Sequence, residues 1–149
     1  MLKTIAFACV VAGCLAAGAM PALAIDPEPV AVSPDLAPIR TRIKAKDFRN
    51  AAEELFVLER KAQNADIYNL LAFSLRNLGD YEQSALYYRK ALDYDANHKG
   101  ALEYQGELFV KLGDLAKAHQ NLAKLAALCP NGCEELDDLR EAIEKAPAK

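Results

Sequence analysis

Residues 68–97 read YNLLAFSLRNLGDYEQSALYYRKALDYDAN, and the same pattern returns 34 residues later, at residues 102–131, as LEYQGELFVKLGDLAKAHQNLAKLAALCPN. In both copies a Leu-Gly-Asp tripeptide, at 78–80 and at 112–114, separates two amphipathic stretches of helix length. This period is typical of helix–turn–helix repeats that stack into a solenoid. Each repeat buries its apolar face only against its neighbours, so the pattern predicts an all-α fold whose function is binding.

The residues at matching positions identify the repeats more closely. The first copy combines a Gly-Asp-Tyr turn with small and aromatic residues at fixed places: Ala72, Ser84, Tyr88 and Ala91. This combination closely resembles the tetratricopeptide repeat (TPR) family. The second copy keeps most of the pattern: Gly106, the Gly-Asp turn, Ala118, Leu122 and Pro130. It departs from the family at Leu115, where an aromatic residue is preferred, and at Leu125, where Ala is preferred.

The small residues have a physical role in such a hairpin. Two antiparallel helices approach to about 8–10 Å where small side chains meet at the crossing. We expect Ala72 to meet Ser84 in one hairpin and Gly106 to meet Ala118 in the next. The glycine of each turn should take the left-handed conformation that ends the first helix, and the Asp after it should cap the second helix.

The resemblance predicts a right-handed α-solenoid of about three TPR-like hairpins followed by a capping helix. In the first, degenerate unit Lys46 stands where the turn glycine would be, and the second helix is expected to run from Arg49 to Gln63. The capping helix should place Leu136, Leu139 and Ile143 on one face, with acids elsewhere. The repeat domain at 38–145 then divides into a degenerate repeat at 38–63, repeats at 65–98 and 99–132, a capping helix at 133–145 and, beyond it, a tail at 146–149.

The start of the chain reads as a targeting segment. Lys3 precedes an apolar run that ends in the small-x-small sequence Ala22-Leu23-Ala24, as in a secretory signal peptide at 1–24 that is cleaved after Ala24. Two alternatives are lipidation of Cys14 and a retained membrane anchor. Residues 25–37 are rich in proline and predict a semi-extended tether. The sequence therefore predicts a periplasmic or secreted protein.

Two of the four cysteines lie in this leader, which leaves Cys129 and Cys133 in the mature chain. In an oxidising compartment, cysteines four residues apart can meet across the Pro-Asn-Gly turn between them, so a structural disulfide is the first interpretation. A thiol redox site and a metal site built from the two thiolates are the alternatives. The mature chain would contain no Met to complete a copper site, since Met1 and Met20 fall in the leader.

Charge and composition argue against several other functions. The formal net charge of −3 comes with no run of basic and aromatic residues, so nothing indicates a nucleic-acid partner. No nucleophile and base occur at a recognisable spacing, and His119 reads as a packed or surface side chain. We predict no catalysis, no cofactor, no metal and no small-molecule substrate, and instead a protein or peptide partner.

The TPR resemblance implies that the first helix of each hairpin lines a concave groove. The groove residues would be Asn69, Phe73, Arg76, Asn77, Glu103, Tyr104, Glu107 and Lys111. Because Glu103 and Glu107 face this space, a clamp for a terminal carboxylate is not supported. We expect an extended or helical segment that carries basic residues, with Asn69 bonding its backbone and Phe73 or Tyr104 anchoring it. Three units are near the minimum for a stable solenoid, so self-association is a further expectation.

Overall fold

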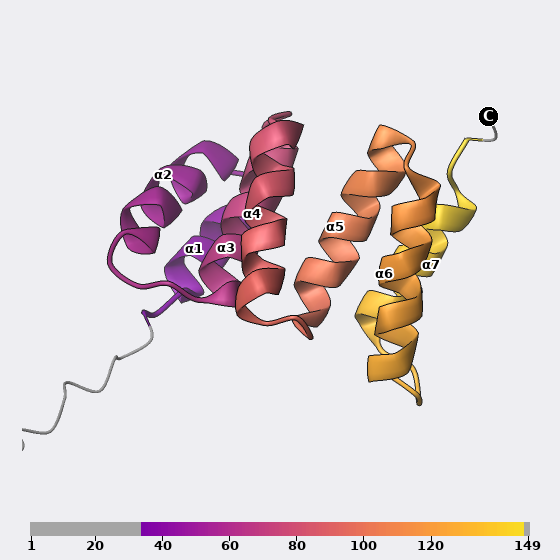
Figure 1. The fold of residues 1–149 in the computed structure, drawn as a ribbon. Helices are drawn as coiled ribbons and strands as arrows, with labels where there is room; N and C mark the ends of the chain where they lie inside the picture. Colours follow the sequence, from indigo (N-terminus) through magenta and orange to yellow (C-terminus); the bar gives the residue numbers. More distant parts are fainter. Residues whose placement is uncertain (1–33, 148–149) are drawn as a thin grey trace, which may run out of the picture. The chain divides into compact units, whose positions relative to one another are not determined.

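A computed structural model describes residues 34–147 of the chain. The predicted leader at 1–24 and residues 25–33 of the predicted tether lie outside these described residues. Within 34–147 the regular structure is all helical (Figure 1). The helices are α1 (Ala37–Lys44), α2 (Phe48–Glu59), α3 (Ala65–Asn77), α4 (Tyr81–Tyr94), α5 (Lys99–Leu112), α6 (Leu115–Leu128) and α7 (Glu134–Glu144). In this range no helix has the length and apolar character needed to cross a bilayer.

The helices pair as the repeat pattern predicts. Helices α1 and α2, α3 and α4, and α5 and α6 pack as consecutive hairpins, and α7 packs against both α5 and α6. Contacts between α2 and α3, between α3 and α5, and between α4 and α5 join each hairpin to the next. The prediction of an all-α stack of three hairpins with a C-terminal capping helix is confirmed.

The turn residues adopt the conformations that their chemistry favours. Gly79 and Gly113 have φ of 87° and 77°, the left-handed region in which glycine carries no Cβ penalty. The side chain of Asp80 accepts a hydrogen bond from the Gln83 N–H, which caps α4, and Asp114 caps α6 in the same way. Lys46, which stands in the glycine position of the degenerate unit, also has a positive φ, of 61°.

The second hairpin crosses at the predicted small residues. Ala72 and Ser84 are both fully buried, and the Ser84 hydroxyl donates a hydrogen bond of 2.9 Å to the Ala72 carbonyl oxygen. A larger residue at either position would push α3 and α4 apart, since the backbone of one helix lies within hydrogen-bond reach of the other's side chain. The crossing is therefore close and also specific in register.

The third hairpin has a contact at Gly106 that the sequence did not predict. A Cβ built on Gly106 would lie 2.6 Å from both Cδ atoms of Leu139, so α7 fills the space beside this glycine. Ala118 is itself fully buried. The reason is that α7 packs on α5, and the glycine leaves room for the Leu139 side chain.

The first unit also differs in one boundary. Helix α2 ends at Glu59 rather than at Gln63. The side chain of Asn64 accepts a hydrogen bond from the Ile67 N–H and so caps α3, which begins at Ala65. The chain has to turn between these two helices, and residues 60–63 make that turn.

The buried side chains form two clusters. The larger cluster joins helices α1, α2, α3, α4 and α5, and the smaller cluster joins α5, α6 and α7. The smaller cluster consists of Leu102, Leu125, Cys129, Leu136 and Leu139, with Ile143 packed against it. The apolar face predicted for the capping helix is therefore the face that α7 buries.

A disulfide joins Cys129, at the end of α6, to Cys133, immediately before α7. The two Cα atoms are 5.8 Å apart, within the usual range for this bond. Its position at the junction of the last hairpin and the capping helix is the one that the sequence predicts for a structural staple.

Candidate peptide-binding groove

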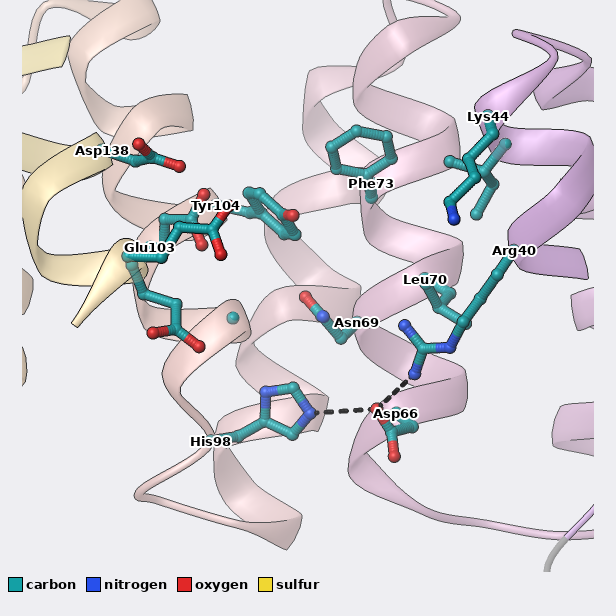
Figure 2. A pocket seen from close by; sticks show the side chains of 14 residues that line it. Arg40, Lys44, Asp66, Asn69, Leu70, Phe73, His98, Glu103, Tyr104 and Asp138 are labelled. Atoms are coloured by element: carbon teal, nitrogen blue, oxygen red, sulfur yellow. Dashed lines mark hydrogen bonds and ion pairs between the residues drawn. The ribbon is translucent and has the colours of Figure 1, made fainter. Parts of the chain in front are cut away.

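A pocket of about 450 Å³ opens on the side of the stack formed by α1, α3, α5 and α7 (Figure 2). Its lining residues come from the first helix of each hairpin and from the capping helix, with His98 at the start of α5. This is the side that the TPR resemblance assigns to the concave groove. We call it the groove pocket.

The structure brings four of the eight predicted residues into the groove pocket: Asn69, Phe73, Glu103 and Tyr104. The other four lie beside it. Arg76, Asn77 and Lys111 line a separate hollow next to the α3–α4 turn, and Glu107 lines a shallow hollow against α7. The roles of all eight residues in binding stay a prediction.

Arg76 is engaged within the protein. Its guanidinium forms an ion pair of 2.5 Å with Glu107 and donates a hydrogen bond of 3.3 Å to the Tyr104 carbonyl oxygen. The same group lies 5.2 Å from the ring centroid of Phe73 and 5.5 Å from that of Tyr104. Arg76 and Glu107 therefore neutralise each other and hold the two aromatic rings in place.

The aromatic residues form the apolar part of the pocket. The ring centroids of Phe73 and Tyr104 are 4.8 Å apart at an angle of 55°, and the ring centroid of Phe48 of α2 lies 6.1 Å from that of Phe73. Leu70 completes this surface. Such a patch, flanked by polar groups, suits an apolar side chain of a bound segment.

One wall of the groove pocket is acidic. Glu103 is only 5% exposed, and Glu134, Glu135 and Asp138 of α7 line the pocket beside it. Burial is the largest cause that raises the pKa of Glu103 to about 8, and the neighbouring carboxylates of Glu107, Asp138 and Glu135 raise it further, against the lowering effect of Arg76.

The opposite wall, on α1, is basic. Arg40 and Lys44 stand one turn apart, and Ile43 lies between them in sequence. Arg40 forms an ion pair of 3.0 Å with Asp66. His98 approaches the same Asp66 oxygen with its Nε2 at 3.4 Å, while its Nδ1 accepts a hydrogen bond from the Ala101 N–H.

Of the residues in these two walls, the sequence predicted only Glu103 as part of the groove, and it missed the wall residues on α1 and α7. The spacing of Arg40 and Lys44 places them on one helix face, and Glu134, Glu135 and Asp138 share a face in the same way, so a signal was present. The sequence assigns these helices to a degenerate repeat and to a capping helix, and it gives neither of them a place in the groove. Among residues 34–147 no three His, Cys, Asp or Glu side chains are arranged to hold a metal ion.

Asn69 lies between the two walls (Figure 2). Its side chain is 4% exposed, and its Oδ1 has no hydrogen-bond partner among the described residues. A buried polar atom without a partner is uncommon in native proteins, because it loses its bonds to water and gains none. Asn69 therefore brings to the lining of the groove pocket a side-chain oxygen that lacks a donor.

Comparison with known proteins agrees with the repeat pattern. Residues 65–98 match the family model for the tetratricopeptide repeat. The chain is 31% identical over 88 residues to Tetratricopeptide repeat protein 16 of Mus musculus, a match that covers 59% of this chain and 12% of that protein. These two matches confirm the resemblance on which the predicted fold depends.

Two solved structures have a similar fold. They are PcrH in complex with the chaperone binding region of PopB and PcrH in complex with the chaperone binding region of PopD. Each has a TM-score of 0.62 and 21% sequence identity over 71% of this chain, and the matches cover 86% and 80% of the respective PcrH chains. At this identity the likeness concerns the fold alone.

Proposed function

Because this chain is a tetratricopeptide repeat protein, we propose that it is a non-catalytic interaction module that holds a segment of a partner protein in the groove pocket. The observation that carries the proposal is the composition of the pocket. Aromatic rings, a buried acceptor without a partner and two charged walls converge on one concave surface. Solenoid repeats use such surfaces to bind extended or helical segments.

The solved structures of similar fold support the same kind of function. In both, PcrH is bound to a region of another protein. We infer that this chain likewise acts by binding, as an adaptor or scaffold for a second protein. The proposal includes no catalytic step, and it assigns the disulfide between Cys129 and Cys133 to the scaffold rather than to electron transfer.

We further propose that the module works in the cell envelope. This part rests on the sequence, in which the apolar leader at 1–24 precedes a small-x-small cleavage site. The cysteine pair fits an oxidising compartment. Mass spectrometry of the chain purified from its native cells tests the proposal: a mature chain that begins at Ile25 supports it, and an unprocessed chain recovered from the cytoplasm would contradict it.

The binding proposal is tested by photo-crosslinking in the native cells. A photo-reactive amino acid replaces Tyr104 in the groove pocket, and a control variant carries it at Lys124, an exposed position of α6. We expect one defined protein adduct from position 104 and none of the same mass from position 124. Adducts that are equal at the two positions, or that arise only from position 124, would exclude the groove pocket as the binding surface.

A further inference from the structure

The charges of the groove pocket are divided between its two sides. Figure 2 shows Arg40 and Lys44 on one side and Glu103 and Asp138 on the other, with Asn69 between them. A partner segment that lies across this pocket therefore meets a positive wall on α1 and a negative wall on α5 and α7. The division sets a requirement on the charges of the segment itself.

The protein neutralises some of these charges and leaves others. Arg40 is paired with Asp66, and Glu107, just outside the pocket, is paired with Arg76. In the described part of the chain no ion-pair partner is found for Lys44. The same holds, within residues 34–147, for the wall carboxylates Glu103, Glu134, Glu135 and Asp138. The unpaired basic group is thus on α1, and the unpaired acidic groups are on α5 and α7.

Glu103 makes the missing positive charge most evident. Its carboxyl group is buried beside Glu107, Asp138 and Glu135, and Arg76 is the cation that acts on it. Burial and these acids raise the pKa of Glu103 to about 8. A Lys or Arg side chain brought into the pocket would supply the countercharge that the protein lacks at this position.

Asn69 indicates that the occupant is a polypeptide. Asn69 lines the pocket and its Oδ1 lacks a donor, which a free anion or a plain hydrocarbon chain does not offer. An extended segment provides a backbone N–H donor at every second residue on each side. This observation is independent of the charges on the two walls.

We propose that the groove pocket selects an extended protein segment that carries a Lys or Arg toward Glu103 and α7 and an Asp or Glu toward Lys44, with a backbone N–H bonded to Asn69 Oδ1. The proposal rests on the proposed function, and it names the class of partner. Its occupant is a charge-paired segment and not simply a basic one, because Lys44 opposes a segment that is basic throughout.

The spacing of the two charges follows from helix packing. From α1 to α5 the segment crosses two interhelix steps, each of about 8–10 Å. An extended chain advances about 3.3 Å per residue, so about five residues cover this span. We therefore expect the acidic and the basic residue to be about five positions apart, with an apolar residue between them over Phe73 and Tyr104.

The test is selection from a library of random twelve-residue peptides, displayed on phage, against the full mature chain in its oxidised form. Selection is repeated with Lys44→Glu, with Asp138→Lys and with the control Lys124→Glu, all three at exposed positions. Circular dichroism verifies that each variant is folded. Recovered peptides are then assayed on a chain with the photo-reactive residue at position 104, to establish that they occupy the groove pocket.

We expect the peptides that are selected by the unmodified chain to contain one acidic and one basic residue about five positions apart. Selection against Lys44→Glu should no longer favour the acidic residue. This variant should also bind such peptides about fivefold more weakly than the unmodified chain does, which is the upper range for the loss of an exposed ion pair. Asp138→Lys should lower the affinity for the same peptides by a similar factor, because it repels their basic residue. The control Lys124→Glu should leave the affinity within about twofold of that of the unmodified chain.

Two results would overturn the proposal, and they are distinguishable. The first result is a set of peptides that crosslink at position 104 but carry no acidic and basic pair, or that bind Lys44→Glu and Asp138→Lys as tightly as the unmodified chain. This result would refute the charge selection and leave the proposed function of the groove pocket intact. Absence of any enriched peptide that crosslinks at position 104 would count against both the charge selection and the proposed function.

Discussion

Replacing Glu103 by Gln should change how the stability of the protein depends on pH. In the folded chain the pKa of Glu103 is raised from 4.5 to about 8 by burial and by the acids around it. Between these two values the folded state holds a proton that the unfolded state has lost. The free energy of unfolding must therefore fall as the pH rises through this interval.

The size of the effect follows from the same interval. One pH unit corresponds to about 1.4 kcal/mol for a single proton, which gives an upper limit of about 5 kcal/mol over the whole range. The pocket is open to water, which lowers the penalty for the charged form, so we expect about 2 to 3 kcal/mol between about pH 5 and pH 8. Glu103→Gln keeps the shape of the side chain and removes the titrating proton.

Urea unfolding followed by circular dichroism measures this difference at each pH. The free energy of unfolding of the unmodified chain minus that of Glu103→Gln should fall by about 2 to 3 kcal/mol as the pH rises. Glu53→Gln, on the exposed face of α2, serves as the control and should give a curve parallel to that of the unmodified chain. If the difference between the unmodified chain and Glu103→Gln stays constant across this range, the reasoning about the buried carboxyl group is refuted.

Two further variants test the packing of the capping helix. Gly106→Ala should lower the free energy of unfolding by about 1 kcal/mol, although Ala is the better helix former. The reason is that the new Cβ would lie 2.6 Å from the Cδ atoms of the fully buried Leu139. An increase in Tm would contradict this prediction and show that Leu139 moves aside freely. Replacing both Cys129 and Cys133 by Ser should lower the free energy of unfolding in urea by about 2 kcal/mol at most, since the loop that the disulfide closes is short; a loss well above this figure would mean that the bond does more than restrict the unfolded chain.

The fold could be predicted from the sequence because its determinants are local and occur twice. A glycine followed by Asp ends one helix and caps the next, and both features are readable from neighbouring residues. The pairing of Ala72 with Ser84 was predictable for the same reason, since the two residues lie within one repeat. The contact of Gly106 with Leu139 was not predicted, because Leu139 belongs to the capping helix, which lies outside the repeat pattern.

The site was less predictable because it depends on which charges meet across helices. The TPR resemblance placed Asn69, Phe73, Glu103 and Tyr104 on helix faces that do line one pocket. It gave no means of knowing that Arg76 and Glu107, 31 positions apart, would pair with each other. Apart from Glu103, the residues of the two charged walls come from α1 and α7, the least regular parts of the repeat pattern, where only a tertiary structure shows that their polar faces line one pocket.

Charges that are paired within the protein and charges that are left unpaired have different roles in the groove. Where a cation and an anion of the protein meet, as at Arg76 and Glu107, the pair fixes the aromatic rings and needs nothing more. Where the charges are left apart, on α1 and on α5 with α7, each wall gives up stability that a pairing within the chain would have provided. Such a cost is expected at a surface that is completed by a partner. The capping helix therefore has two roles, since its apolar face closes the core at Gly106 and its acidic face forms one wall of the groove pocket.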